Sequence, residues 1–159
     1  MGVSGCGKTA IGTRFAHALG IEFVEGDSYH SPANIQKMSA GIPLDDQDRT
    51  DWLRAIASRI RRANDTGEGV VVSCSALKRA YRDIIRAEGG SVKFIFLRGE
   101  RSLIAERLAA RTGHYMPATL LDSQFAALEE PSTDEGAWVA DIDASPDAIV
   151  ASLVARATA

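Results

Sequence analysis

The sequence predicts an α/β fold organised around a parallel sheet. Short apolar runs typical of buried strands alternate with amphipathic stretches typical of helices, which favours parallel strands joined by helices. The chain also opens on a glycine-rich motif, residues 2–9, that leads directly into the first amphipathic stretch. With 159 residues and no repeat, low-complexity tract or dividing linker, residues 1–159 are expected to form one domain.

The expected elements follow in order along the chain. Ile11 and Phe15 share one face of the first helix, and Ser145 followed by Pro146 is typical of a helix start. The patterns predict helices at residues 8–19, 51–64, 77–87, 103–111 and from Ser145 onward, and strands at residues 22–24, 70–72, 94–97 and 138–142. Two polar-rich segments, residues 28–48 and 112–132, interrupt the alternation and are expected to form the acceptor site and a lid.

Composition narrows the class of protein. Hydrophobic residues make up 45% of the chain and charged residues 25%, as in ordinary globular domains. The net charge of −3 argues against nucleic acid as a partner, and no stretch approaches the roughly 20 apolar residues of a membrane span. A cytoplasmic protein without a membrane partner is expected, with Cys6 and Cys74 as buried thiols rather than a disulfide.

Residues 2–9 form a complete phosphate-binding loop of the pattern Gly-x-x-x-x-Gly-Lys-Thr. Its glycines let successive backbone N–H groups converge on the phosphates of a nucleotide, and the helix behind it points its positive end at the same anion. Lys8 is placed to reach the β- and γ-phosphate oxygens, and the Thr9 hydroxyl to bind Mg²⁺. The sequence therefore predicts a site for a nucleoside triphosphate and magnesium.

A phosphate-binding loop alone does not separate a switch GTPase, an ATP-driven motor and a small-molecule kinase. The Asn-Lys-x-Asp guanine signature of GTPases does not occur in the chain. Motors carry an acidic residue at the end of the strand beside the loop, whereas residues 70–72 run into Ser73 and Cys74. A small kinase is the remaining interpretation.

Glu25 and Asp27 are two carboxylates at positions i and i+2 after the strand at residues 22–24. This spacing at a strand end points both side chains toward the phosphates. One can hold the magnesium shell, and the other can accept the proton of an attacking hydroxyl, with Asp27 the favoured base.

Two pairs of basic residues are candidates for binding negative charge. Arg107 and Arg111 lie one helical turn apart before the expected lid, where they could neutralise charge during phosphoryl transfer. Lys78 and Arg82 are also one turn apart and could face the cleft as a clamp for an acceptor carboxylate. For Arg107 and Arg111, a solvated basic helix face is the alternative.

Together these segments resemble the gluconate kinases of the phosphate-loop type, in order and over essentially the whole chain. The most specific matches are Gly-Ile-Pro-Leu-Asp-Asp-Gln-Asp-Arg at residues 41–49 and Cys-Ser-Ala-Leu-Lys at residues 74–78. Further matches are the phosphate-binding loop and the segments at residues 25–30, 34–38, 52–53, 81–83, 111–116, 123–125 and 128–131.

The resemblance implies transfer of the ATP γ-phosphoryl group to the 6-hydroxyl of D-gluconate by a magnesium-dependent homodimer. It implies a three-layer fold with a parallel sheet in the order 2-3-1-4-5 and a helical lid near residues 111–131. The nucleotide would be held by Gly2, Ser4, Gly5, Cys6, Gly7, Lys8, Thr9 and Arg107, and the metal by Thr9 and Glu25. Catalysis would use Lys8, Asp27 and Arg111, and gluconate would contact Asp27, His30, Ser75, Lys78 and Arg82.

Two departures from that family accompany the resemblance. Many relatives have Asp where this chain has Glu25, and the strand expected before the phosphate-binding loop is missing or truncated, since only Met1 precedes residues 2–9. We expect the native protein to begin roughly six to fifteen residues upstream, with a Val/Ile-rich strand. The alternatives are a related kinase acting on another sugar acid or polyol, and an inactive nucleotide-binding protein.

Overall fold

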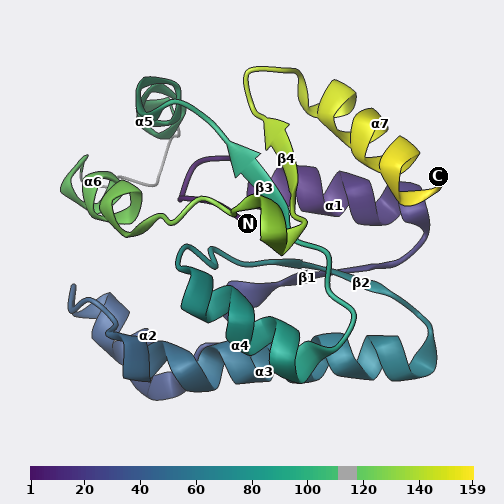
Figure 1. The fold of residues 1–159 in the computed structure, drawn as a ribbon. Coiled ribbons are helices and arrows are strands. Elements are labelled where there is room, and N and C mark those ends of the chain that lie inside the picture. The colour runs from purple at the N-terminus through teal and green to yellow at the C-terminus, as the bar shows by residue number, and fades with distance from the viewer. Residues whose placement is uncertain (111–117) are drawn as a thin grey trace.

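Helices and short strands alternate through the computed structural model, which describes residues 1–110 and 118–159 (Figure 1). The strands are β1 (Glu22–Glu25), β2 (Val70–Ser73), β3 (Ile95–Arg98) and β4 (Trp138–Asp141). The α-helices are α1 (Lys8–Leu19), α2 (Pro32–Ser39), α3 (Asp46–Thr66), α4 (Arg79–Gly89), α5 (Arg101–Ala109), α6 (Ala118–Ala127) and α7 (Pro146–Ala157). Two 3₁₀ turns, η1 (Gly26–Tyr29) and η2 (Thr133–Glu135), complete the described elements.

The strands form two parallel pairs, and the first residues of the chain lie between them. β1 pairs with β2, and β3 pairs with β4. The Leu97 N–H donates to the Met1 carbonyl (3.0 Å), and the Gly2 N–H donates to the Ser75 carbonyl (3.1 Å). The order across the molecule is therefore β1, β2, Met1, β3, β4, which agrees with the predicted order 2-3-1-4-5 when Met1 is given the position of the first strand.

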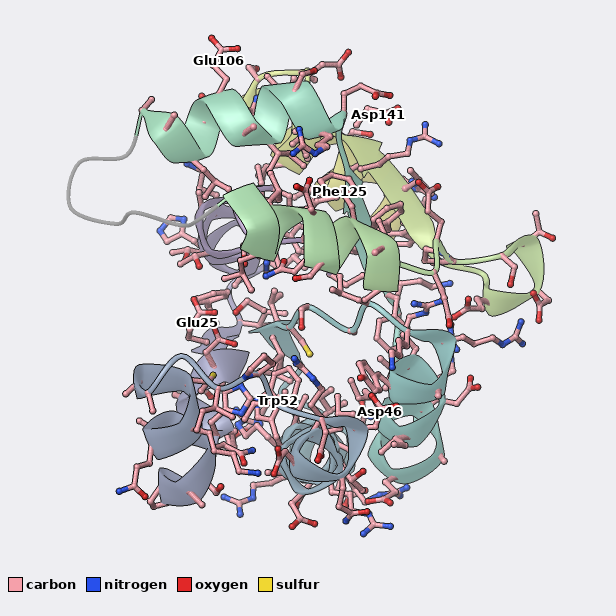
Figure 2. All side chains as sticks on the ribbon, turned by 90° about the vertical axis from the view of Figure 1, so that its left-hand side faces the viewer. Glu25, Asp46, Trp52, Glu106, Phe125 and Asp141 are labelled. Atoms are coloured by element: carbon pink, nitrogen blue, oxygen red, sulfur yellow. The ribbon has the colours of Figure 1, made fainter. Side chains whose placement is uncertain are left out.

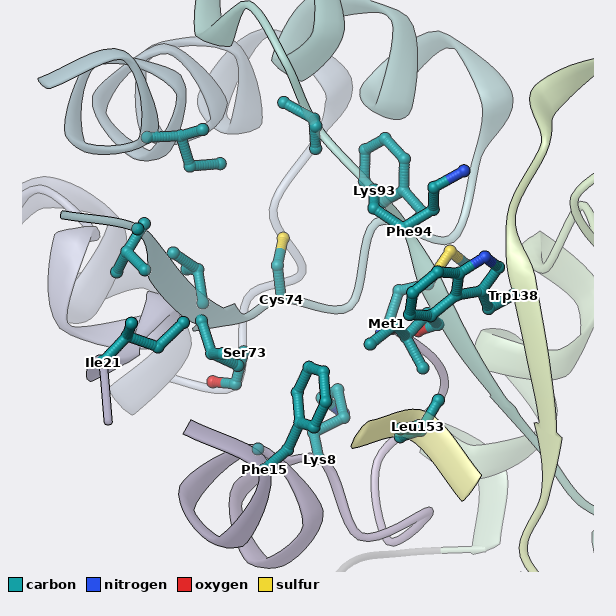
Figure 3. A pocket seen from close by; sticks show the side chains of 18 of the residues that line it. Met1, Lys8, Phe15, Ile21, Ser73, Cys74, Lys93, Phe94, Trp138 and Leu153 are labelled. Carbon is teal, nitrogen blue, oxygen red and sulfur yellow. The ribbon is translucent and has the colours of Figure 1, made fainter. Parts of the chain in front are cut away.

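A cavity of about 340 Å³ lies between the two strand pairs (Figure 3). Side chains from both pairs and from α1 line it, including Met1, Phe15, Val71, Phe94, Ile95 and Trp138. β2 and β3 do not hydrogen-bond to each other, so the edges that face this cavity lack a neighbouring strand along most of their length. The cavity is mostly apolar and lies where the predicted first strand would run, but a strand upstream of Met1 stays a prediction.

Helices cover the strands in two layers, each with its own core. α1 and α7 contact each other on one side, and α3 and α4 pack together on the other (Figure 1). The first core is centred on residues such as Phe15 and Leu153, and the second on Trp52, Ile56 and Ile85. Burying these large apolar side chains is the main favourable contribution to folding, and it fixes the strand ends that carry the polar site.

Most element boundaries agree with the sequence patterns, and the differences have local causes. α3 begins at Asp46 rather than at residue 51, because Asp45 and Asp48 form a reciprocal capping box. α2 lies in a segment where no helix was predicted, although Ser31 caps it and Pro32 begins it, the same signature that correctly predicted α7. α4 begins two residues later than predicted, at Arg79.

The predicted lid, near residues 111–131, falls partly outside the described residues. Its later part contains α6, which is anchored in the first core by Leu121. Movement of this segment over a nucleotide stays a prediction. None of the described helices combines the length and the apolar character needed to cross a membrane.

Candidate active site

The phosphate-binding loop adopts a conformation that only glycine accommodates at two of its turns. Gly2 and Gly5 have φ values of 141° and 83°. A Cβ atom on Gly5 would lie 2.7 Å from the side chain of Leu108 in α5, and one on Gly2 would lie 2.9 Å from the Leu97 carbonyl oxygen. The loop is therefore packed closely between β3 and α5, and leads into α1 through Gly7.

The predicted catalytic lysine lies across this loop. The Lys8 ammonium donates to the carbonyl oxygens of Gly2 (3.1 Å) and Val3 (3.0 Å). Its charge is thus held at the N-terminus of α1, where backbone N–H groups already favour an anion. Cys6, within the loop, is buried and unpaired, as is Cys74, whose pKa is raised to about 11 by burial.

The two predicted metal ligands meet beside the loop. The Thr9 hydroxyl donates to one carboxylate oxygen of Glu25 (2.7 Å), and the Ser73 hydroxyl donates to the other. Glu25 and Ser73 lie opposite each other at the carboxyl ends of β1 and β2, so the parallel register brings them together. Sequence reasoning did not single out Ser73 for this contact, because the strand register is not visible in the sequence.

The donor set at this point suits magnesium. Within residues 1–110 and 118–159, no three His, Cys, Asp or Glu side chains gather as an all-protein metal site. Mg²⁺ usually binds one or two carboxylates while phosphate and water supply its other oxygens. A single carboxylate between the Thr9 and Ser73 hydroxyls fits that pattern.

Asp27 and His30 lie next to this cluster, in and just after η1. The Asp27 side chain is 77% exposed, whereas the His30 side chain is only 6% exposed, and their nearest atoms are 4.0 Å apart. The His30 ring stacks on Trp52 with ring centres 4.4 Å apart, and burial lowers the pKa of His30. Trp52 also donates its indole N–H to the Gly26 carbonyl (2.8 Å). One buried side chain therefore supports both His30 and the backbone just before Asp27.

In Figure 2, Glu25 and Trp52 lie in the lower half of the molecule, and Phe125 of α6 lies in the upper half. His30 Nδ1 is buried without a hydrogen-bond partner among the described residues. A buried polar nitrogen without a partner is costly, which makes this atom a candidate contact for a substrate hydroxyl.

The segment after β2 forms the other side of the site. The Lys78 ammonium donates to both carboxylate oxygens of Asp46 (2.8 and 3.0 Å), and this bond raises the pKa of Lys78. Ser75 is fixed through its carbonyl by Gly2, and the following residue, Ala76, is buried with a φ of 42°. A non-glycine residue in this region is strained, which is common next to functional sites.

Comparison with known proteins shows which family has a similar sequence and fold. A family model described as shikimate kinase matches residues 4–154. A gluconokinase from Gluconobacter oxydans is 44% identical over 97% of this chain and 86% of its own length. The thermoresistant gluconokinase of Escherichia coli is 41% identical over 97% of this chain and 89% of its own length. A crystal structure of a gluconokinase from Sinorhizobium meliloti superposes with a TM-score of 0.85 at 48% identity, covering 94% of this chain and 84% of that one.

The chain belongs to the gluconokinases of the shikimate kinase family. This membership makes it a small-molecule kinase, with the ATP use that the kinase family implies. Membership in this family agrees with the observed α/β fold and with the phosphate-binding loop packed between β3 and α5.

One predicted gluconate ligand of this gluconokinase is buried in an ion pair instead. The Arg82 side chain is 0% exposed, and its guanidinium donates to both carboxylate oxygens of Glu135 (2.6 and 2.7 Å). It also donates to the carbonyls of Ala76 and Leu77, each at 3.1 Å. This position contradicts the prediction that Arg82 faces the cleft and holds the acceptor carboxylate.

The error has a local cause. The one-turn spacing from Lys78 to Arg82 places both side chains on one face only if both are helical, and Lys78 is the extended N-cap residue of α4. Arg82 therefore points inward toward the turn at residues 76–77, while Lys78 points toward α3. Glu135 carried no sequence signal that tied it to Arg82, since 53 residues separate the two.

The arginines predicted to bind nucleotide are only partly described. Arg107 donates to the Ile142 carbonyl (2.6 Å), beyond the end of β4. Arg111 lies outside the described residues. Gln124 of α6, which sequence reasoning did not assign a role, contacts the phosphate-binding loop through Ser4.

Proposed function

We propose that this enzyme transfers the γ-phosphoryl group of ATP to the 6-hydroxyl of D-gluconate, giving 6-phospho-D-gluconate. The observation that carries the proposal is the Thr9–Glu25–Ser73 cluster beside Lys8 of the phosphate-binding loop, with the exposed Asp27 carboxylate two residues beyond Glu25. A phosphate donor and a base for an acceptor hydroxyl would then face each other. The gluconokinase names of near-full-length relatives support gluconate as the acceptor.

In this proposal the loop N–H groups and Lys8 hold the phosphates. The Lys8 ammonium would leave the carbonyls of Gly2 and Val3 and follow the γ-phosphoryl group, whose charge is spread over its outer oxygens during transfer. Gly2, Ser4, Gly5, Cys6, Gly7 and Thr9 would complete the loop contacts. Arg107 and Arg111 remain proposed ligands of the nucleotide, with Arg111 in the catalytic role.

Thr9 and Glu25 are the proposed protein ligands of Mg²⁺, with Ser73 holding the second Glu25 oxygen. When bound, the ion would offset the negative charge shared by the phosphates and the transferred group. The Glu25 carboxylate accepts hydrogen bonds from two hydroxyl donors. Those donors orient it before any cation arrives.

Asp27 is the proposed base for the 6-hydroxyl. Its exposed carboxylate is free to accept the hydroxyl proton as the oxygen attacks phosphorus. His30 would stay neutral, since burial lowers its pKa, and its unpartnered Nδ1 would accept a hydrogen bond from another gluconate hydroxyl. Trp52 would hold His30 in that orientation by stacking.

Lys78 is the proposed partner of the gluconate carboxylate. Its side chain is 34% exposed and its ammonium already pairs with the carboxylate of Asp46, so a substrate carboxylate would share or exchange that partner. Ser75 would contribute a hydroxyl next to it. Arg82 is left out of the pocket, because its guanidinium is enclosed by Glu135 and two carbonyl groups.

The test is ADP release in the presence of Mg²⁺ with a panel of acceptors: D-gluconate, D-glucose, shikimate, another sugar acid and a polyol. We expect turnover with gluconate and little above background with the others. Turnover with another sugar acid or polyol alone would favour the related-kinase alternative. Nucleotide binding without turnover of any acceptor would favour the inactive alternative.

A homodimer and a cytoplasmic location complete the proposal. Light scattering coupled to size-exclusion chromatography should give a mass near 34 kDa, which is twice the chain mass of 17.0 kDa. A mass near that of a single chain would contradict the dimer.

A further inference from the structure

A side chain from α6 holds the outer limb of the phosphate-binding loop, which consists of Ser4 and Gly5. The Ser4 N–H donates to Gln124 Oε1 (2.7 Å), and Gln124 Nε2 donates to the Ser4 hydroxyl (3.0 Å). One amide therefore bonds to two polar groups, the N–H and the hydroxyl, of a loop residue 120 positions away in the chain. Such a two-bond contact fixes the rotation of the Ser4 peptide as well as its position.

α6 is suited to act as a fixed support. Leu121, one turn before Gln124, is buried in the first core, and Arg101 of α5 donates to Asp122 (2.6 Å). Just after the helix, the Glu129 N–H donates to the Leu77 carbonyl (2.9 Å). Because the helix is anchored on both sides of Gln124, the amide reaches the loop from a defined place.

A second contact presses on the same limb of the loop. Leu108 of α5 lies against Gly5, so close that a Cβ atom there would be 2.7 Å away. Gly2 and Val3 form the inner limb of the loop. Their carbonyl oxygens accept hydrogen bonds from the Lys8 ammonium. If Lys8 turns to the phosphates when nucleotide binds, those two bonds are lost, while the Gln124 contact can persist.

We propose that Gln124 is a positioning residue for nucleotide binding: its amide holds the Ser4 peptide so that the loop is ordered before the phosphates arrive. A loop ordered in advance loses less conformational freedom on binding, which strengthens affinity without any contact to the ligand. The inference rests on the proposed use of ATP by this loop. It predicts that Gln124 affects nucleotide affinity and leaves acceptor binding alone.

The test is the affinity of the full chain for a non-hydrolysable ATP analogue with Mg²⁺, measured by calorimetry. Gln124→Met keeps the length and volume of the side chain but removes both hydrogen bonds. Its Kd should rise roughly ten- to thirtyfold, as expected for losing one to two hydrogen bonds. Gln124→Asn, which is too short to reach Ser4, is the second variant and should show the same loss.

Ser123→Ala is the matched control, since the Ser123 hydroxyl donates within its own helix, to the Leu120 carbonyl, and the nucleotide Kd of this variant should equal that of wild type. KM for gluconate should be unchanged in all three variants, whereas a general loosening of the site would raise it together with the nucleotide Kd. A double-mutant cycle with Ser4→Ala should be non-additive, because Gln124→Met then removes only one bond.

Unchanged nucleotide Kd in both folded Gln124 variants would overturn the inference while leaving the proposed function intact. A lower Kd would also overturn it, because Gln124 would then compete with phosphate for the Ser4 N–H. If wild-type protein fails to bind the analogue, the proposed function fails first and the inference with it.

Discussion

The two sides of the candidate active site are built in different ways. The nucleotide side consists of the phosphate-binding loop with Glu25 and Ser73. The loop, including Lys8 and Thr9, is one contiguous stretch of sequence, residues 2–9. The acceptor side consists of Asp27, His30 and the segment at residues 75–78, supported by Trp52 and Asp46 from α3. A contiguous motif carries its own geometry, whereas the acceptor side depends on helices that are distant in sequence.

Charge is also distributed differently on the two sides. On the nucleotide side, Lys8 bonds to two neutral carbonyls among the described residues and can leave them for a phosphate. On the acceptor side, Lys78 is paired with Asp46, and Arg82 is enclosed with Glu135. The nucleotide side thus presents a cation bonded to neutral groups, while Lys78 and Arg82 near the acceptor side already have carboxylate partners.

The largest expected effect is on the nucleotide side. Lys8→Ala should lower kcat by about a thousandfold or more, because it removes the charge that follows the transferred phosphoryl group. Lys93→Ala is the control, since the Lys93 ammonium bonds to the Gly136 carbonyl away from the site. Steady-state kinetics with gluconate and ATP would measure both, and a Lys8 variant within tenfold of wild type would contradict the assignment.

Asp27→Asn should have the next largest effect and tests the acceptor side. The amide keeps the shape of the side chain but cannot accept the hydroxyl proton, and loss of a general base costs about 10²–10⁴-fold in kcat. Nucleotide affinity should stay near the wild-type value. Retention of more than about half of the wild-type kcat would show that another group is the base.

Arg82→Met should affect stability rather than substrate binding. Removing the guanidinium leaves the Glu135 carboxylate buried without its main partner, which typically costs about 3–5 kcal/mol in the free energy of unfolding. The double variant Arg82→Met/Glu135→Met should recover much of that loss, because no unpaired charge remains. Chemical denaturation measures both; a stable single variant with a raised KM for gluconate would restore Arg82 to the acceptor side.

The same ion pair should make stability depend on pH in the acid range. The hydrogen bond from Arg82 lowers the pKa of Glu135 from 4.5 to about 2. Because the folded-state pKa is the lower one, this contribution is complete above pH 4.5 and is lost as the pH falls toward about 2. Unfolding free energies of wild type should fall across this window more steeply than those of the double Met variant, and parallel curves would count against the pair.

The smallest expected effect is at Lys78. Lys78→Met should raise KM for gluconate by about tenfold, the order expected from losing one charged hydrogen bond, with nucleotide affinity unchanged. Arg79→Met is a control, since Arg79 pairs with Asp134 at the surface. An unchanged KM would move the carboxylate partner elsewhere, with His30 the next candidate.

The sequence predicted the contiguous nucleotide motif better than the contacts between distant segments. The phosphate-binding loop, Lys8, Thr9 and most strands and helices could be predicted, because local spacing and periodicity determine them. Ser73 and Gln124 could not, since their contacts depend on strand register and on the packing of α6. The Arg82 prediction was wrong because it assumed that α4 began before Lys78, and a helix start is the least certain part of a periodic pattern.

Phosphorus NMR of the products formed from ATP and D-gluconate tests most directly whether the two sides act together. We expect a phosphomonoester on the primary 6-hydroxyl, whose phosphorus couples to two protons, formed in step with ADP and absent with Lys8→Ala. Inorganic phosphate as the main product, or a phosphoryl group on any other position of the sugar acid, would contradict a site in which Asp27 presents the 6-hydroxyl of gluconate to the nucleotide.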